Sequence, residues 1–166
     1  MDAPLPPRTG ADDDDREVVA GLLGRWPEGL FDVVVRDDAG VPVVIRNHPL
    51  LDDGRPMPTR FWLVADELRS RIGTLESTGG VRAAEEDCDP AELAEAHDRY
   101  AAERDAAIPE DHEGHRPSGG VGGTRQGVKC LHAHYAWFLA GGDDPVGRWV
   151  HARLQGRPAS TEESGG

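Results

Sequence analysis

Two β-rich runs separated by a short turn constrain the fold of this chain more than any other feature. The runs are Phe31–Arg36 and Val41–Arg46, and valine and isoleucine dominate both. Residues 37–40 between them read Asp-Asp-Ala-Gly, and these residue types favour tight turns. The sequence therefore predicts an antiparallel β-hairpin, and the short apolar run Phe61–Val64 is predicted to add a third strand.

Apolar residues at helical spacing flank the predicted hairpin on both sides. The predicted helices cover residues 12–26, a segment carrying Leu68, Ile72 and Leu75 that ends near 79–80, and residues 89–107, 127–140 and 144–154. Asp89 followed by proline is typical of a helix start. The predicted fold is α+β: a small antiparallel sheet built on the β-hairpin, packed against four or five helices. A chain of 166 residues is about one domain. We assign that domain to residues 12–154, between a disordered leader (1–11) and a disordered tail (155–166).

Charge and composition restrict the function classes. The net charge is −13, and both nucleic acids and anionic membranes bind basic surfaces, so neither is an expected partner. No run of 18 apolar residues is present, and residues 1–15 lack the apolar region of a secretory signal. Two cysteines are too few for a disulfide framework. We therefore expect a cytoplasmic protein.

The segment 119–134 has the composition of a binding site, because a glycine-rich loop runs into a predicted helix. Glycines allow close approach of a ligand to the backbone, and a helix N-terminus attracts anions. The candidate ligand-binding residues are Gly122, Gly123, Thr124, Arg125, Lys129 and His132, and Lys129 is the only lysine of the chain. The segment lacks the Walker pattern of phosphate-binding loops. The alternative is a flexible loop whose arginine pairs with a nearby acid.

A metal site is a second candidate in the same segment. Cys130 and His134 are four residues apart and would share one face of a helix, whereas His132 would point away from them. Zinc accepts cysteine and histidine ligands, and iron is a further possibility. The alternative is a buried thiol and a hydrogen-bonded core histidine. Acid–base or nucleophilic chemistry by His132, Lys129 and Cys130 is a third candidate, without a recognised nucleophile motif to support it.

The run Val-Lys-Cys-Leu-His at residues 128–132 resembles a bacterial family called domain of unknown function 501, which is common in actinobacteria. Similar stretches occur at residues 58–63, 75–80 and 89–104, and the resemblance covers roughly residues 17–150. The family pattern has Cys-Pro pairs where this chain has residues 37–38 and 65–66, so the resemblance implies no multi-cysteine metal site. It also implies genes neighbouring those of a cell-division septum protein and an exopolyphosphatase-type enzyme.

The leading hypothesis from the sequence is a protein that binds a small anionic ligand, bearing phosphate or carboxylate, at the glycine-rich loop. One alternative is a non-catalytic interaction protein with a protein partner in cell division or phosphate metabolism. The other is a metal-dependent enzyme that uses Cys130 and His134. The sequence leaves open whether the protein is an enzyme, which ligand it binds and whether it forms oligomers.

Overall fold

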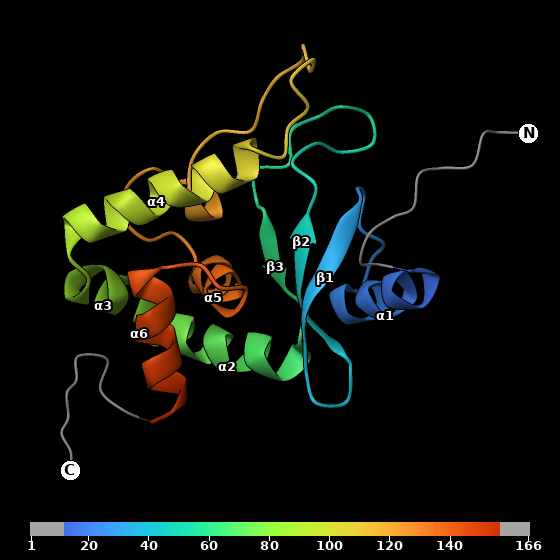
Figure 1. The fold of residues 1–166 in the computed structure, drawn as a ribbon. Coiled ribbons are helices and arrows are strands. Elements are labelled where there is room, and N and C mark those ends of the chain that lie inside the picture. The colour runs from blue at the N-terminus through green and yellow to red at the C-terminus, as the bar shows by residue number, and fades with distance from the viewer. Residues whose placement is uncertain (1–11, 157–166) are drawn as a thin grey trace, which may run out of the picture.

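The fold centres on a three-stranded antiparallel sheet with helices on both faces (Figure 1). The structure is a computed structural model, and it describes residues 12–156. The strands are β1 (Phe31–Arg36), β2 (Pro42–Asn47) and β3 (Phe61–Leu63), in the order β1-β2-β3. The predicted α+β class, with an antiparallel sheet built on a hairpin and a third strand beside it, is confirmed.

The described residues contain more helices than the sequence predicts. The α-helices are α1 (Asp13–Leu23), α2 (Asp66–Ser77), α3 (Gly80–Asp87), α4 (Pro90–Asp105), α5 (Leu131–Leu139) and α6 (Pro145–Leu154), and a short 3₁₀ helix, η1, covers Val121–Gly123. The prediction of four or five helices missed α3. Gly79 takes a left-handed φ of 91°, which lets the chain turn and start a new helix with only two residues between α2 and α3.

The hairpin turn is stabilised by hydrogen bonds between residues of the turn itself. The Asp37 carboxylate accepts hydrogen bonds from the backbone N–H groups of Ala39 and Val41, both at 2.9 Å. Gly40 has a φ of 87°, which glycine adopts without steric cost. The turn therefore needs no partner from elsewhere in the chain, and this is why the sequence alone predicts it.

The sheet separates a small layer from a large one. Figure 1 shows α1 on one side of the strands and α2 to α6 on the other. On the α1 side, Val19 packs with Phe31, Ile45 and Val64. The core on the other side is larger, and it joins β2 and β3 to α2, α3, α4, α5 and α6. Because strand residues alternate between faces, Phe61 and Leu63 face the large core while Trp62 packs against the small one.

Two helix starts behave as predicted, and one does not. Asp89 accepts a hydrogen bond from the N–H of Glu92 at the start of α4, and Asp144 caps α6 in the same way. The predicted helix at residues 127–140 is wrong at its beginning. Cys130 is extended (φ −151°, ψ 120°), and α5 starts only at Leu131. Lys129 and Cys130 therefore precede the helix.

Tertiary contacts explain the late start of α5. The N–H of Val128 donates to the Glu85 carboxylate at 2.9 Å, and the N–H of Leu131 donates to Glu76 Oε2 at 2.8 Å. These two bonds hold residues 128–131 in an extended path that pattern reasoning along the chain does not foresee.

Some predictions fall on parts of the chain outside the structure. The predicted leader (1–11) and most of the predicted tail (157–166) lie outside the described residues. Within the described range, none of the helices combines the length and the apolar character needed to span a membrane.

Candidate functional site

A cavity of about 400 Å³ lies beside β3, which is an edge strand of the sheet. The apolar part of its wall comes from both layers of the fold: Leu23 at the end of α1, Phe61, Trp62 and Leu63 of β3, and Ala133 of α5. Because β3 has a free edge, the C-terminal end of α1 and the first turn of α5 can reach around it. The cavity therefore depends on segments far apart in the sequence.

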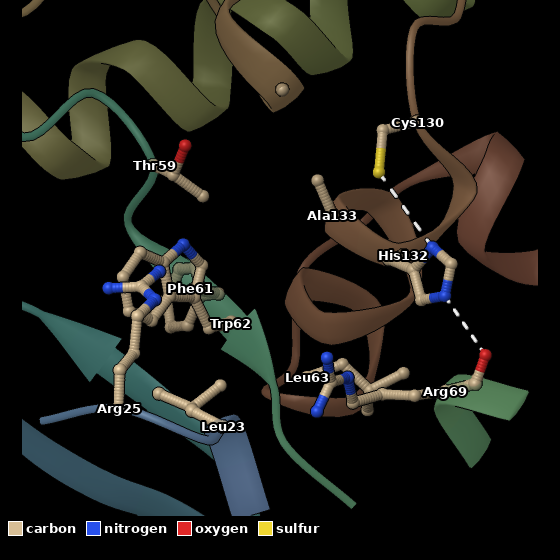
Figure 2. Close-up of a pocket in the computed structure, with 11 residues that line it drawn as sticks. Leu23, Arg25, Thr59, Phe61, Trp62, Leu63, Arg69, Cys130, His132 and Ala133 are labelled. Atoms are coloured by element: carbon tan, nitrogen blue, oxygen red, sulfur yellow. Dashed lines mark hydrogen bonds between the residues drawn. The ribbon is translucent and has the colours of Figure 1, made fainter. Parts of the chain in front are cut away.

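Polar and charged side chains complete the cavity wall. Arg25, Thr59, Arg69, Cys130 and His132 all line it. Figure 2 shows Cys130 and His132 on one side, with Thr59 and Arg25 on the opposite side and Arg69 below. The arrangement places two guanidinium groups, a thiol and an imidazole around a partly apolar space.

Neither arginine has a carboxylate closer than 3.9 Å among the described residues. The Arg25 guanidinium lies over the Trp62 ring, 5.3 Å from its centroid. Arg69 Nη1 donates to the carbonyl of Leu22 at 3.0 Å, and its nearest carboxylate oxygen, on exposed Asp66, is 3.9 Å away. Within residues 12–156, Arg25 has no carboxylate within 4.0 Å. Positive charge is thus available at the cavity despite the acidic character of the chain.

His132 is the most strongly bonded member of the wall. Its Nδ1 lies 3.3 Å from Glu76 Oε2 and 4.0 Å from the Cys130 sulfur, and its Nε2 lies 3.0 Å from the carbonyl oxygen of Arg69. The interaction with Cys130 raises the pKa of His132 to about 9, against an opposing effect of burial, and the Arg69 carbonyl and Glu76 carboxylate add to the increase. The imidazole therefore carries a proton at neutral pH.

The predicted ligand-binding residues do not form one site. Gly122 and His132 line the cavity beside β3. Gly123, Thr124 and Arg125 line a separate, shallower surface hollow. Lys129 is exposed at the surface. The predicted grouping of Arg125, Lys129 and His132 around one loop is therefore divided over the surface.

The helix N-terminus that was predicted to bind an anion already faces a carboxylate of the protein itself. Leu131, the first residue of α5, donates its N–H to Glu76 Oε2. Glu76 comes from the end of α2, and no spacing in the sequence relates it to residues 128–132. The N-terminus of α5 is therefore already occupied by Glu76, whereas the neighbouring cavity is open.

The predicted pairing of Cys130 with His134 is not formed. His134 is fully buried, and its Nδ1 lies 2.6 Å from the carboxylate of Asp144, which is also fully buried. The Cys130 sulfur instead lies beside His132. Cys130 is extended, so the helical spacing that would pair it with His134 does not hold. His132, which was predicted to point away from Cys130, lies beside it instead.

Two buried polar residues that sequence reasoning did not select hold the glycine-rich loop in place. The N–H of Val121 donates to Nδ1 of His97, and His97 Nε2 lies 2.8 Å from the carbonyl oxygen of Gly127. Burial lowers the pKa of His97, which suits the neutral tautomer that both bonds require. Arg104, 1% exposed, donates to the carbonyls of Pro58 and Gly119. The loop is thus tied to α4 at both of its ends.

Comparison with known proteins gives a family but no described activity. Residues 33–152 match the model of a family described as protein of unknown function (DUF501). Neither the curated proteins nor the solved structures contain a significant match to the chain. Because the family match spans most of the 166 residues, the chain belongs to the DUF501 family.

Proposed function

We propose that the protein binds a small anionic ligand, bearing a phosphate or carboxylate group, in the cavity beside β3. The observation that carries the proposal is the pair of arginines, Arg25 and Arg69, which line one cavity. Among the described residues Arg25 has no carboxylate within 4.0 Å, and Arg69 has only a 3.9 Å ion pair with exposed Asp66. Guanidinium groups bind phosphate and carboxylate through paired hydrogen bonds. His132 lines the same wall, and in the metal-free protein its protonated ring lies beside the Glu76 carboxylate.

The apolar side of the cavity limits the kind of anion that fits. Phe61, Trp62 and Leu63 of β3 and Ala133 of α5 supply an apolar part of the wall. Pockets of several hundred Å³ with an apolar lining and a few polar groups are typical of small-molecule sites. The ligand class is therefore an anionic group attached to a small apolar body, and inorganic ions alone would use only part of the wall.

Phenyl phosphate and benzoate are suitable probes of this site, and phenol is the matched neutral compound. We expect both anions to shift the backbone amide resonances of Trp62 and His132 in titrations followed by NMR, and phenol to bind more weakly. Removing one charged hydrogen-bond donor costs about 1.5–3 kcal/mol, so Arg25→Gln and Arg69→Gln should each weaken binding about tenfold or more. Ionic strength is held constant because salt screens such interactions.

The control is Arg82→Gln, which removes the same charge from an exposed position on α3. It should bind phenyl phosphate as the unmodified chain does. Equal affinity in the unmodified chain, Arg25→Gln and Arg69→Gln would refute the proposal, as would binding of phenol as tight as that of phenyl phosphate.

A further inference from the structure

Three metal-ligating side chains meet at the edge of the cavity. A carboxylate oxygen of Glu76, the sulfur of Cys130 and a ring nitrogen of His132 all lie within 4.8 Å of one another. They come from the end of α2, from the residue before α5 and from its first turn, so the fold brings together groups separated by more than 50 residues. Cysteine, histidine and glutamate are the ligand types that zinc binds.

The hydrogen bonds around the cluster orient its donor atoms. His132 Nε2 lies 3.0 Å from the carbonyl oxygen of Arg69, which can only accept, so Nε2 carries a hydrogen. Zinc would displace the Nδ1 proton that His132 carries at neutral pH, and the freed lone pair would face Glu76 and Cys130. Metal-bound histidines typically donate their other N–H to a carbonyl or carboxylate in this way.

Glu76 is oriented by the same principle. Its Oε2 accepts the N–H of Leu131 at 2.8 Å, which fixes the carboxylate between α2 and the start of α5. Tetrahedral zinc, with bonds of roughly 2.0–2.3 Å, places its ligand atoms about 3.3–3.8 Å apart. The cluster therefore needs only a small contraction to close around an ion.

We propose that Glu76, Cys130 and His132 bind one zinc ion, with a fourth coordination position that faces the cavity. Cys130 and His132 line the cavity wall, whereas Glu76 approaches from the side of α2. Three protein ligands and an open position are the arrangement of zinc sites that bind water or a ligand, and structural sites normally have four protein ligands. Thiolate and imidazole favour zinc over magnesium or calcium, which prefer oxygen ligands.

The zinc site extends the proposed function. The class of anion expected at its open position is taken from that proposed function. The open position points into the space that Arg25 and Arg69 also line. An oxygen of a phosphate or carboxylate could occupy that position while a guanidinium binds another oxygen of the same group. Zinc and the arginines would then select the same class of anion.

The test uses the untagged full chain, freed of metal with a chelator and titrated with zinc and with cobalt(II). We expect one zinc per chain by competition with a chromophoric chelator. Cobalt should give a near-ultraviolet sulfur-to-cobalt charge-transfer band, because that band requires a thiolate ligand. Cys130→Ser and His132→Gln should weaken zinc binding about 10- to 100-fold or more, and Cys130→Ser should abolish the band.

Matched variants separate ligands from bystanders. Cys88→Ala removes the other thiol, whose pKa burial raises to about 11, and should keep both the band and the zinc affinity. His112→Gln removes a half-buried loop histidine outside the cluster and should also bind zinc normally. Glu76→Gln keeps an oxygen to accept the Leu131 N–H, so it should fold normally and still lose zinc affinity. Thermal melting of each metal-free variant confirms its folding.

Two results would overturn the site: no charge-transfer band in the unmodified chain, or a band and zinc affinity that survive in folded Cys130→Ser. Zinc binding is measured without any organic anion, so its outcome is independent of the arginine variants. If zinc binds but does not tighten phenyl phosphate binding at least about tenfold, the open position does not face the cavity and the assigned geometry is wrong.

Discussion

Asp15 and Arg36 form a two-pronged ion pair that ties α1 to β1. Arg36 Nη1 donates to Oδ1 at 3.0 Å, and Nη2 donates to Oδ2 at 2.7 Å. These hydrogen bonds hold the pKa of Asp15 below its ordinary value of 3.8. Because the pKa is lower in the folded than in the unfolded chain, the pair stabilises the fold above pH 3.8, and this stabilisation is lost as the pH falls through the folded pKa.

We therefore expect Asp15→Asn to lower the free energy of unfolding by about 0.5–1 kcal/mol at neutral pH, a modest value because Arg36 is partly exposed. The difference from the unmodified chain should shrink as the pH is lowered below about 4. Urea unfolding across this pH range measures both effects. Asp14→Asn is the control, since exposed Asp14 is in the same helical turn and makes no ion pair among residues 12–156. A constant difference at every pH would contradict the assigned linkage.

At the residue scale, the sequence indicates which residue types matter and misses their partners. Cys130 and His132 are recognisable candidates, because thiol and imidazole are both metal-ligating groups and lie two residues apart. Glu76 is not recognisable, since only the packing of α2 against α5 brings it to His132. His134 has the same side chain as His132 but is fully buried against Asp144. Residue type alone does not tell which histidine lines the cavity. The position at which α5 starts decides this, because it sets the direction in which each side chain points.

The packing of α5 against α6 depends on a glycine at the point of closest approach. A Cβ added to Gly147 of α6 would lie 2.3 Å from Cβ of Phe138 in α5. We expect Gly147→Ala to separate the two helices and to destabilise the fold by about 1–3 kcal/mol, even though alanine is the better helix former. Thermal and urea unfolding, with circular dichroism as the signal, measure the loss.

Gly73→Ala is the matched control within a helix. Gly73 lies inside α2, and a Cβ added there has no neighbour within 4 Å. The substitution should stabilise the protein by about 0.4–1 kcal/mol, because alanine reduces the conformational entropy of the unfolded chain. If both variants were more stable than the unmodified chain, backbone propensity rather than helix packing would dominate at Gly147.

At the element scale, a turn or helix start can be predicted from the sequence when its stabilising hydrogen bonds join residues close together in the chain. The hairpin turn, the Asp89 cap and the Asp144 cap use groups within four residues of one another, and the sequence predicts the turn and both helix starts. The start of α5 depends on carboxylates 43 and 55 residues away, and its prediction was wrong. The chain turn at Gly79 that precedes α3 is local but carries no strong cap signal, so α3 was missed.

The whole molecule has two unequal cores, and the cavity lies where they meet. Four buried residues form the small core under α1, whereas twenty form the core on the other face. Elements that bury little apolar surface open locally at a lower free energy than the global unfolding of the protein. We therefore expect the amides of α1 to exchange by local opening and those of α5 to exchange only on global unfolding.

Val19→Ala tests this difference directly. Val19 is fully buried in the small core, so its truncation should lower the free energy of opening of α1 by about 1–2 kcal/mol and leave exchange in α5 nearly unchanged. Hydrogen exchange followed by mass spectrometry resolves the two helices. Val150→Ala, a truncation of the same size in α6 and the large core, should instead lower protection in α5.

Equal loss of protection in α1 and α5 for both variants would mean that the two layers unfold as one unit. Independent opening has a direct consequence for the cavity, because Leu23 at the end of α1 and Arg25 just beyond it form part of its wall. When α1 detaches, this part of the wall and the bond from Arg69 to the Leu22 carbonyl are lost, while Cys130 stays packed on the large core. The small layer would then control access to the cavity, and the metal-ligating cluster would remain folded behind it.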